Sequence, residues 1–244
     1  CLLFESAKPV FVDINPESYN MDPSSIEAAI TPRTKAILPV EVFGSPAHFD
    51  RYEQIARKHN LAMIEDCCES LGGTLRTRPV GSFGDCGVFA FYPNKQITTG
   101  EGGMIVTDSE EIRDTCISLR NQGRSGQAWL THARLGYNYR MSEIHAAIGE
   151  VQMLRLDGIL EKRRRAANLY DQALTDIEEI DLPPMHDRET ASWFVYVILL
   201  ADRFSPDQRN GVIEHLRRNG VDCSNYFPPI HTLPHIMERT GTKA

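Results

Sequence analysis

Short apolar runs alternate along the first half of the chain with stretches in which apolar residues recur every three or four positions. The first pattern predicts strands and the second predicts amphipathic helices. Between residues 50 and 60, for example, Tyr52, Ile55 and Ala56 fall on one helical face. Strands are predicted at 10–14, 36–43, 61–66, 88–92 and 104–107, and helices at 24–30, 50–60 and 110–120. Such an alternation predicts a doubly wound α/β domain with a mostly parallel sheet.

The second half begins with one long helical pattern. After an irregular segment at 123–139, Ser142 is a good N-cap, and helical periodicity continues to about residue 174. The charged run at 161–165 within this helix is expected to face solvent.

A smaller α+β unit is predicted after the long helix. Residues 193–200 and 221–226 are predicted strands on either side of a helix at 206–219, for which Gly220 is the expected terminator. The predicted division is a large α/β domain over 1–141, a connecting helix over 142–175 and a small C-terminal α+β domain over 176–244.

Composition is compatible with this architecture and narrows the class of protein. The chain has 244 residues, of which 41% are hydrophobic and 24% charged, with a formal net charge of −7. It is long enough to bury a globular core. No apolar run approaches the roughly 20 residues that a membrane span needs, and no signal peptide is recognisable, so a cytoplasmic protein without membrane contacts is expected. The acidic balance without a basic stripe argues against nucleic acid as a partner.

The cysteines and histidines do not predict a metal site. None of the six cysteines forms a C-x-x-C pair, so reduced thiols are expected. His231 and His235 have the i, i+4 spacing of a helical metal pair, but Pro234 lies between them.

Lys95 is the best catalytic candidate in the chain. It lies in a Pro-Asn turn between two predicted strands, and a glycine-rich turn follows it. Its neighbours in sequence include Phe89, Phe91, Tyr92 and Ile97, and desolvation by such residues favours the neutral amine, a nucleophile toward aldehydes. The alternative is a solvated turn lysine.

Asp66 strengthens this interpretation. It ends a short apolar run that is predicted to be a buried parallel strand, and ligands of open α/β sheets bind at the carboxyl ends of such strands. A lysine that forms a Schiff base and an acid that keeps the pyridine nitrogen protonated are the pair that pyridoxal phosphate chemistry requires. The alternative is that Asp66 caps a helix, with Glu69 completing a capping box.

Five segments, in order and spread over most of the chain, resemble the successive motifs of the DegT/DnrJ/EryC1/StrS family of sugar aminotransferases. The segments are 64–73 (IEDCCESLGG), 89–103 (FAFYPNK, then TTGEGG), 119–124 (LRNQGR), 136–142 (GYNYRMS) and 226–231 (YFPPIH). The resemblance implies the aspartate-aminotransferase fold, fold type I, and pyridoxal 5'-phosphate as cofactor.

The resemblance also implies a reaction. An amino acid, glutamate or glutamine, would give its amino group to a keto-sugar nucleotide, as in polysaccharide, O-antigen or secondary-metabolite sugar biosynthesis. Lys95 would hold the cofactor aldehyde and Asp66 its ring nitrogen. Family members that are sugar 3-dehydratases have histidine in place of the lysine, so the retention of Lys95 favours transamination.

Further roles follow from the same resemblance. Glu69 would lie near the phenolic oxygen of the cofactor, and Asn138 would reach the cofactor phosphate of a neighbouring subunit, which implies a homodimer with shared active sites. Tyr92 and His231 would line the sugar side of the cleft. As alternatives, Asn138 would cap a turn before Ser142, and His231 would be a loop packing residue.

Two departures from the family pattern leave other functions open. Ala90 stands where the family often has a serine that contacts the phosphate, and Glu69 stands where it often has glutamine or histidine. A carboxylate facing a phenolate is repelled unless it is protonated, so Glu69 could instead bind a neighbouring amide or hold a helix start. The alternatives are a lyase or dehydratase of fold type I and a homologue that binds pyridoxal phosphate without catalysis.

The resemblance further implies an N-terminal segment with a Gly-Thr phosphate-binding motif and an aromatic residue that stacks on the cofactor ring. Neither motif occurs in the 244 residues. We therefore expect a fragment open at both ends, which by itself would not retain the cofactor or transaminate.

Overall fold

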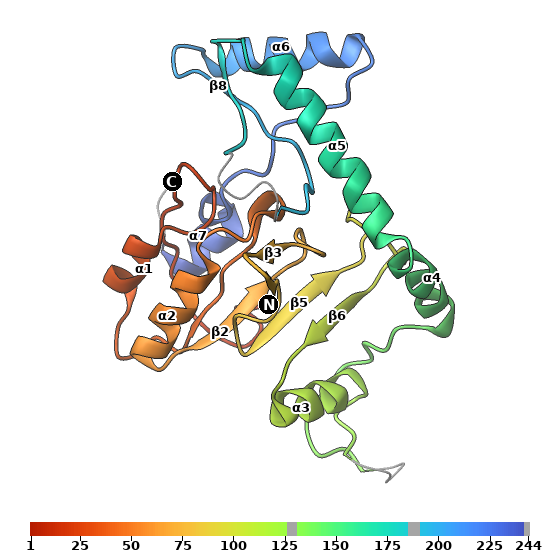
Figure 1. Ribbon diagram of the computed structural model, residues 1–244. Coiled ribbons are helices and arrows are strands. Elements are labelled where there is room, and N and C mark those ends of the chain that lie inside the picture. Colours follow the sequence, from red (N-terminus) through yellow and green to blue (C-terminus); the bar gives the residue numbers. More distant parts are fainter. Residues whose placement is uncertain (126–130, 185–190, 242–244) are drawn as a thin grey trace.

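The computed structural model describes residues 1–125, 131–184 and 191–241 and has a four-stranded sheet near its centre (Figure 1). The strand order is β1 (Ala36–Ile37), β2 (Ala62–Asp66), β5 (Cys86–Ala90) and β6 (Gly103–Val106). The first three strands are parallel and β6 is antiparallel to β5. The predicted mostly parallel sheet is confirmed.

Two helices cover one side of this sheet, α1 (Pro23–Ala29) and α2 (Phe49–His59) (Figure 1). The side chains of Phe49 and Tyr52 are fully buried against Met63 of β2, in a core that also contains Ile37. The N-terminus of α1 is capped by Asp22, whose carboxylate accepts a hydrogen bond from the Ser24 N–H at 3.0 Å.

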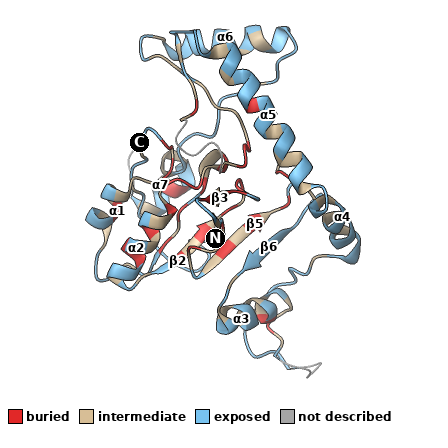
Figure 2. Ribbon diagram, viewed as in Figure 1, coloured by how far each residue is buried: buried red, intermediate tan, exposed pale blue. Residues whose placement is uncertain are grey.

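A hairpin of β3 (Thr74–Leu75) and β4 (Arg78–Pro79) follows β2. A second core, formed by Cys67, Val80, Phe89, Phe91 and Ile97, lies between this hairpin region and the segment that carries Lys95. Figure 2 shows that the buried residues gather around β2, β5 and α2, whereas β6 is exposed along its length.

The predicted long helix is divided in two. After α3 (Glu110–Arg120), α4 (Glu143–Met153) begins at the predicted N-cap, where the Ser142 hydroxyl accepts from the His145 N–H at 3.3 Å. The chain leaves helical hydrogen bonding at 154–155, and α5 (Leu156–Leu174) continues in a new direction toward α6 (Pro206–Arg218) (Figure 1). No described residue of α4 or α6 is buried.

The remaining elements are short. They are the 3-10 turn η1 (Val42–Gly44), the hairpin strands β7 (Ile180–Asp181) and β8 (Leu199–Leu200), the 3-10 turn η2 (Ile230–Thr232) and α7 (Pro234–Thr240). The helix predicted at 206–219 is confirmed as α6, with a capping box formed by Ser205 and Gln208. Across the described residues, no helix combines the length and the apolar character that a membrane crossing needs.

Four strand predictions were wrong in whole or in large part. In residues 10–14 only Ile14 makes a bridge, to Met21, and in 193–200 only Leu199–Leu200 is a strand. No strand occurs at 221–226, all of which the structure describes. The strand expected at 36–43 shortens to β1 because the chain turns into η1, where Phe43 has a left-handed φ of 60°.

The backbone groups of residues 193–194 show why the apolar pattern of this segment led to a wrong strand prediction. The carbonyl groups of Trp193 and Phe194 accept hydrogen bonds from Arg163, and the Phe194 N–H donates to the Phe43 carbonyl at 3.3 Å. Because side-chain and loop partners take these groups, no second strand is needed to satisfy them.

Candidate functional site

Asp66 occupies the position that the sequence predicted, the carboxyl end of β2. It is in register with Val88 of β5, and its N–H donates to the Pro39 carbonyl at 2.9 Å. Its Oδ1 accepts from the Cys68 N–H at 3.1 Å. All residues between Asp66 and β3 are described, and none of them begins a helix, so the helix-cap alternative for Asp66 is wrong.

Lys95 lies in the turn after β5, where its N–H donates to the Tyr92 carbonyl at 3.0 Å. Its side chain is 14% exposed, and Nζ lies 3.5 Å from Glu69 Oε1. The same Nζ lies over the ring of Phe194, 4.4 Å from its centroid. Lys95 is therefore not the solvated turn lysine of the alternative interpretation. Of its predicted apolar neighbours, Tyr92 is the exception, because it is 51% exposed.

The Glu69 side chain binds a neighbouring amide, one of the two alternatives that the sequence left open. Oε2 accepts from the Phe43 N–H at 3.0 Å, and Oε1 accepts from the Tyr226 hydroxyl. The Glu69 side chain is only 11% exposed. Burial, together with the hydrogen bond to Glu69 and the negative charge of that residue, raises the pKa of Tyr226, so its hydroxyl keeps its proton.

A buried polar network holds the backbone of Glu69. The Glu69 carbonyl accepts from Gln96 Nε2 and, at 3.0 Å, from the Ser192 hydroxyl. Gln96 Nε2 also donates to Ser192 Oγ at 2.7 Å, and the Ser192 N–H donates to the Gly44 carbonyl at 2.9 Å. Gly44 has a φ of +89°, and a Cβ there would lie 2.6 Å from Ser192 Oγ, so this contact requires glycine. The network connects the Lys95 turn to a segment almost a hundred residues later.

The charged run at 161–165 of α5 is exposed as predicted, except for Arg163, which is partly buried. Its Nη1 donates to the Trp193 carbonyl at 2.8 Å and to the Phe194 carbonyl at 2.9 Å. Burial lowers the pKa of this guanidinium, and the two carbonyl groups are its compensating partners. Because Phe194 covers Lys95, Arg163 helps to hold in place the segment that covers this lysine.

The cysteines beside Asp66 are not activated nucleophiles. Burial, aided by the hydrogen bond and charge of Asp66, raises the pKa of Cys68 to about 12, although the positive charge of Lys95 acts in the opposite sense. A thiol with this pKa is protonated at neutral pH.

Two buried glutamates lie near Asp66: Glu65, which precedes it in β2, and Glu41, which precedes η1. Glu65 accepts hydrogen bonds from the N–H groups of Gly81, Phe83 and Gly84 at 2.9, 2.6 and 2.6 Å. Glu41 accepts from the Ser70 hydroxyl, and its Oε1 has no partner among the described residues. Oxygen atoms of both glutamates and Cys67 Sγ lie within 4.8 Å of one another. The three N–H groups already bind Glu65, which makes this cluster a support for the 81–84 turn.

The other predicted site residues are more peripheral. Asn138 is exposed, pairs with Asn121 in an isolated bridge, and accepts from Arg140 Nε at 3.0 Å. His231 lies in η2, with its ring 5.9 Å from the ring of Phe11. The structure thus places Glu69 against Lys95 at the sheet edge where Asp66 ends β2, and shows Asn138 and His231 in other contacts.

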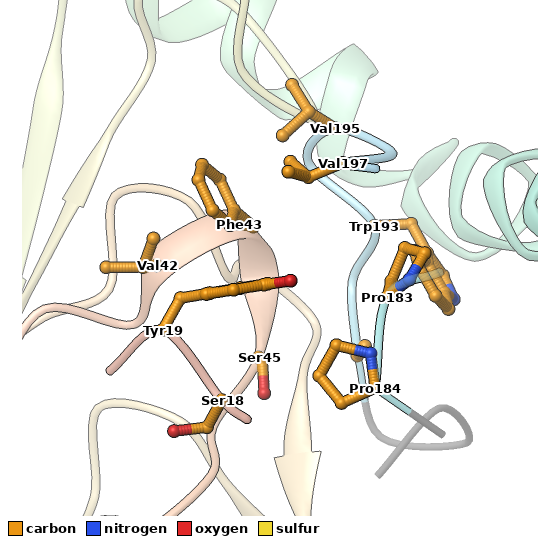
Figure 3. A pocket seen from close by; sticks show the side chains of 11 residues that line it. Ser18, Tyr19, Val42, Phe43, Ser45, Pro183, Pro184, Trp193, Val195 and Val197 are labelled. Atoms are coloured by element: carbon orange, nitrogen blue, oxygen red, sulfur yellow. The ribbon is translucent and has the colours of Figure 1, made fainter. Parts of the chain in front are cut away.

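An apolar hollow lies beside Phe43. Figure 3 shows Tyr19, Val42 and Phe43 on one side of it and Trp193, Val195 and Val197 on the other. None of the predicted site residues lines this hollow. It is lined by residues of the N-terminal part of the chain and of the segment that carries Phe194.

The sequence did not single out Gln96, Ser192, Phe194 or Arg163 as site residues. Gln96 was next to the candidate lysine, and Tyr226 was within a recognised motif, so both could have been examined. Ser192 and Phe194 gave no comparable signal, because their roles depend on contacts with residues far away in sequence.

Known proteins with similar sequences and structures point to one family. The chain is 39% identical over 229 residues to GDP-perosamine synthase of Caulobacter vibrioides, an alignment that covers 93% of this chain and 62% of that protein. It superposes on Helicobacter pylori PseC, an aminotransferase involved in the biosynthesis of pseudoaminic acid, with a TM-score of 0.93 and 28% identity, covering 100% of this chain and 66% of that one. A GDP-4-keto-6-deoxy-D-mannose-3-dehydratase of E. coli with bound hydrated PLP gives a TM-score of 0.82 at 30% identity, covering 91% and 61%.

These matches bear on both fold and extent. They confirm the α/β fold of the fold type I aminotransferases. The chain spans a little under two thirds of the length of the curated relatives that it matches. The sequence profile of the DegT/DnrJ/EryC1/StrS aminotransferase family matches residues 1–244, and the chain belongs to that family.

Proposed function

We propose that the full-length protein is a pyridoxal phosphate-dependent aminotransferase that transfers an amino group from an amino acid to a keto-sugar nucleotide. One observation carries the proposal: the Lys95 amine is withdrawn from solvent between Glu69 and Phe194, at the carboxyl edge of the parallel strands, where β2 ends in Asp66.

The residues present suit pyridoxal phosphate. A primary amine held in a largely apolar setting can attach covalently to an aldehyde, and a carboxylate at the end of the neighbouring strand can pair with a pyridine nitrogen. Lys95 and Asp66 would hold the cofactor in this way. When bound, the pyridoxal ring supplies an electron sink for the carbanion that forms at the substrate Cα.

The residues of this chain then divide the remaining work. Lys95 Nζ would take the proton from the Cα of the amino donor and deliver it to C4′, the aldehyde carbon of the cofactor. Glu69 Oε1 lies 3.5 Å from this amine, and the carboxylate offsets the positive charge that the amine carries when the amine is protonated. Phe194 covers the amine and excludes water from it.

The substrate classes rest on similarity. The similarity to GDP-perosamine synthase supports a nucleotide-linked sugar as the acceptor, and glutamate or glutamine as donor is inferred from the family resemblance. In this proposal Tyr92 and His231 line the sugar side. A dehydratase is the second candidate, because one such enzyme also superposes well on this chain. The retained Lys95 favours transamination.

The assembly is also part of the proposal. Asn138, exposed and hydrogen-bonded only locally among its described contacts, would reach the cofactor phosphate of a second subunit in a homodimer located in the cytoplasm. The hairpin of β7 and β8 and helix α6, which lie at the far end of α5 in Figure 1, would form the small C-terminal domain.

The test is the Lys95→Ala variant of the full-length protein. We expect loss of nearly all amino-sugar product, detected by mass spectrometry with a panel of nucleotide-linked keto-sugars and glutamate as donor, with an unchanged thermal midpoint. Lys58→Ala is the matched control, because Lys58 pairs with Glu27 at an exposed site away from the sheet edge. Wild-type turnover in Lys95→Ala would refute the proposal.

A further inference from the structure

One oxygen of Glu69 serves two partners. Oε1 accepts the Tyr226 hydroxyl and also lies 3.5 Å from Lys95 Nζ. The second oxygen, Oε2, is bound by the Phe43 N–H. Both carboxylate oxygens are therefore held by hydrogen bonds. The oxygen that faces Lys95 also accepts a hydrogen bond from a neutral hydroxyl, which reduces its interaction with the lysine.

Tyr226 reaches this carboxylate from the segment that follows α6. Its ring packs edge-on against Phe43, with centroids 4.8 Å apart and planes at 82°. Phe43 is itself held with a φ of 60°, and its carbonyl accepts the Phe194 N–H. The contact thus joins the loop after β1, the segment over Lys95 and the chain after α6 at one carboxylate.

We infer that Tyr226 is a positioning residue of the site, whose hydroxyl limits how strongly Glu69 holds the Lys95 amine. The inference rests on the proposed function, in which Lys95 must alternate between protonated and neutral forms. A Glu69 carboxylate without the tyrosine hydroxyl would direct more of its charge toward Lys95 and hold the amine more tightly. An amine held in this way reacts more slowly with an aldehyde.

This role predicts effects of opposite sign for two substitutions. Tyr226→Phe removes only the hydroxyl and should slow the reaction of Lys95 with an aldehyde. Glu69→Gln removes the charge and should speed it. A merely structural role would predict faster reaction in both variants, because a loosened site exposes the lysine.

The measurement is reductive methylation of the cofactor-free full-length protein with isotopically labelled formaldehyde and cyanoborohydride. The reaction is run at about pH 7.5, where the reactivity of an amine depends on its protonation. Mass spectrometry of the Lys95 peptide gives the rate. We expect labelling roughly two- to tenfold slower in Tyr226→Phe, the range that one redistributed hydrogen bond permits. Labelling of Glu69→Gln should be faster than wild type by a similar factor.

Tyr196→Phe is the matched control. The Tyr196 hydroxyl also donates to a carboxylate, Asp171 Oδ1 at 2.7 Å, on the side of α5. Its loss should leave Lys95 labelling unchanged. The inference is overturned if Tyr226→Phe labels at the rate of Tyr196→Phe, or faster. Because this readout needs no turnover, such a failure is distinct from failure of the proposed function, which the activity of Lys95→Ala decides.

Discussion

Glu41 shows how a single residue can make stability depend on pH. It is fully buried, and burial together with the charge of Glu65 raises its pKa well above the ordinary 4.5. A group that binds its proton more tightly in the folded state than in the unfolded state makes its full contribution to the free energy of unfolding below the ordinary pKa. That contribution is lost as the pH rises through the range between the ordinary and the raised pKa.

Glu41→Gln should therefore stabilise the protein as the pH increases. The amide oxygen can still accept from Ser70, and the amide nitrogen can donate toward Glu65 without a charge to desolvate. At about pH 8 we expect the free energy of unfolding of the variant to exceed that of wild type by on the order of 1–3 kcal/mol, the cost of an unsatisfied buried group. At about pH 5, close to the ordinary carboxyl pKa, the difference should be much smaller.

Urea unfolding at the two pH values measures this difference. Glu178→Gln, at an exposed position after α5, should show the same stability relative to wild type at both pH values. A Glu41→Gln variant whose stability relative to wild type stays the same or falls as the pH rises would contradict the raised pKa of Glu41.

Among the elements, most helices were predictable and several strands were not, although the single helix predicted over 142–174 is divided into α4 and α5. The helices at 50–60, 110–120 and 206–219 were predicted within one residue, because a capping residue marks the start of the last two and apolar periodicity defines one face of the first. The positions of Asp66 at the carboxyl end of β2 and of Lys95 in the turn after β5 were also predictable, because the apolar runs that form these two strands are evident in the sequence. The segment at 193–200 has the composition of a strand, but its hydrogen bonds are to Arg163 and Phe43, which no local pattern reveals.

Arg163→Met tests whether α5 holds the segment over Lys95. Two carbonyl groups would lose a charged donor, so we expect a loss of roughly 1.5–3 kcal/mol in the free energy of unfolding, the range for a hydrogen bond to a charged group. Arg164→Met is the control, because Arg164 forms an exposed ion pair with Glu161. Equal effects of the two substitutions in urea unfolding would show that Arg163 is no anchor.

At the scale of the whole molecule, the proposed shared site predicts complementation. If Asn138 serves the partner's phosphate, Lys95→Ala and Asn138→Asp subunits are each inactive but together form mixed dimers with one site that carries neither defect. Aspartate is chosen because its charge repels a phosphate. Random exchange should restore about a quarter of wild-type activity, because half of the dimers are mixed and half of their sites are intact.

The experiment requires subunit exchange by unfolding and refolding the two full-length variants together. Wild-type protein taken through the same treatment shows how much activity refolding recovers. A refolded mixture that stays inactive while the wild-type protein recovers would mean that Asn138 does not act across a subunit interface.

The central claim is that Lys95 is the amine that binds the cofactor, and covalent trapping tests it most directly. The full-length protein is incubated with pyridoxal phosphate, reduced with borohydride and digested, and the modified peptide is identified by mass spectrometry. The account predicts one pyridoxyl group per chain, on Lys95, and its absence in Lys95→Ala. A pyridoxyl group found on another lysine at equal stoichiometry, or unchanged trapping in Lys95→Ala, would contradict it.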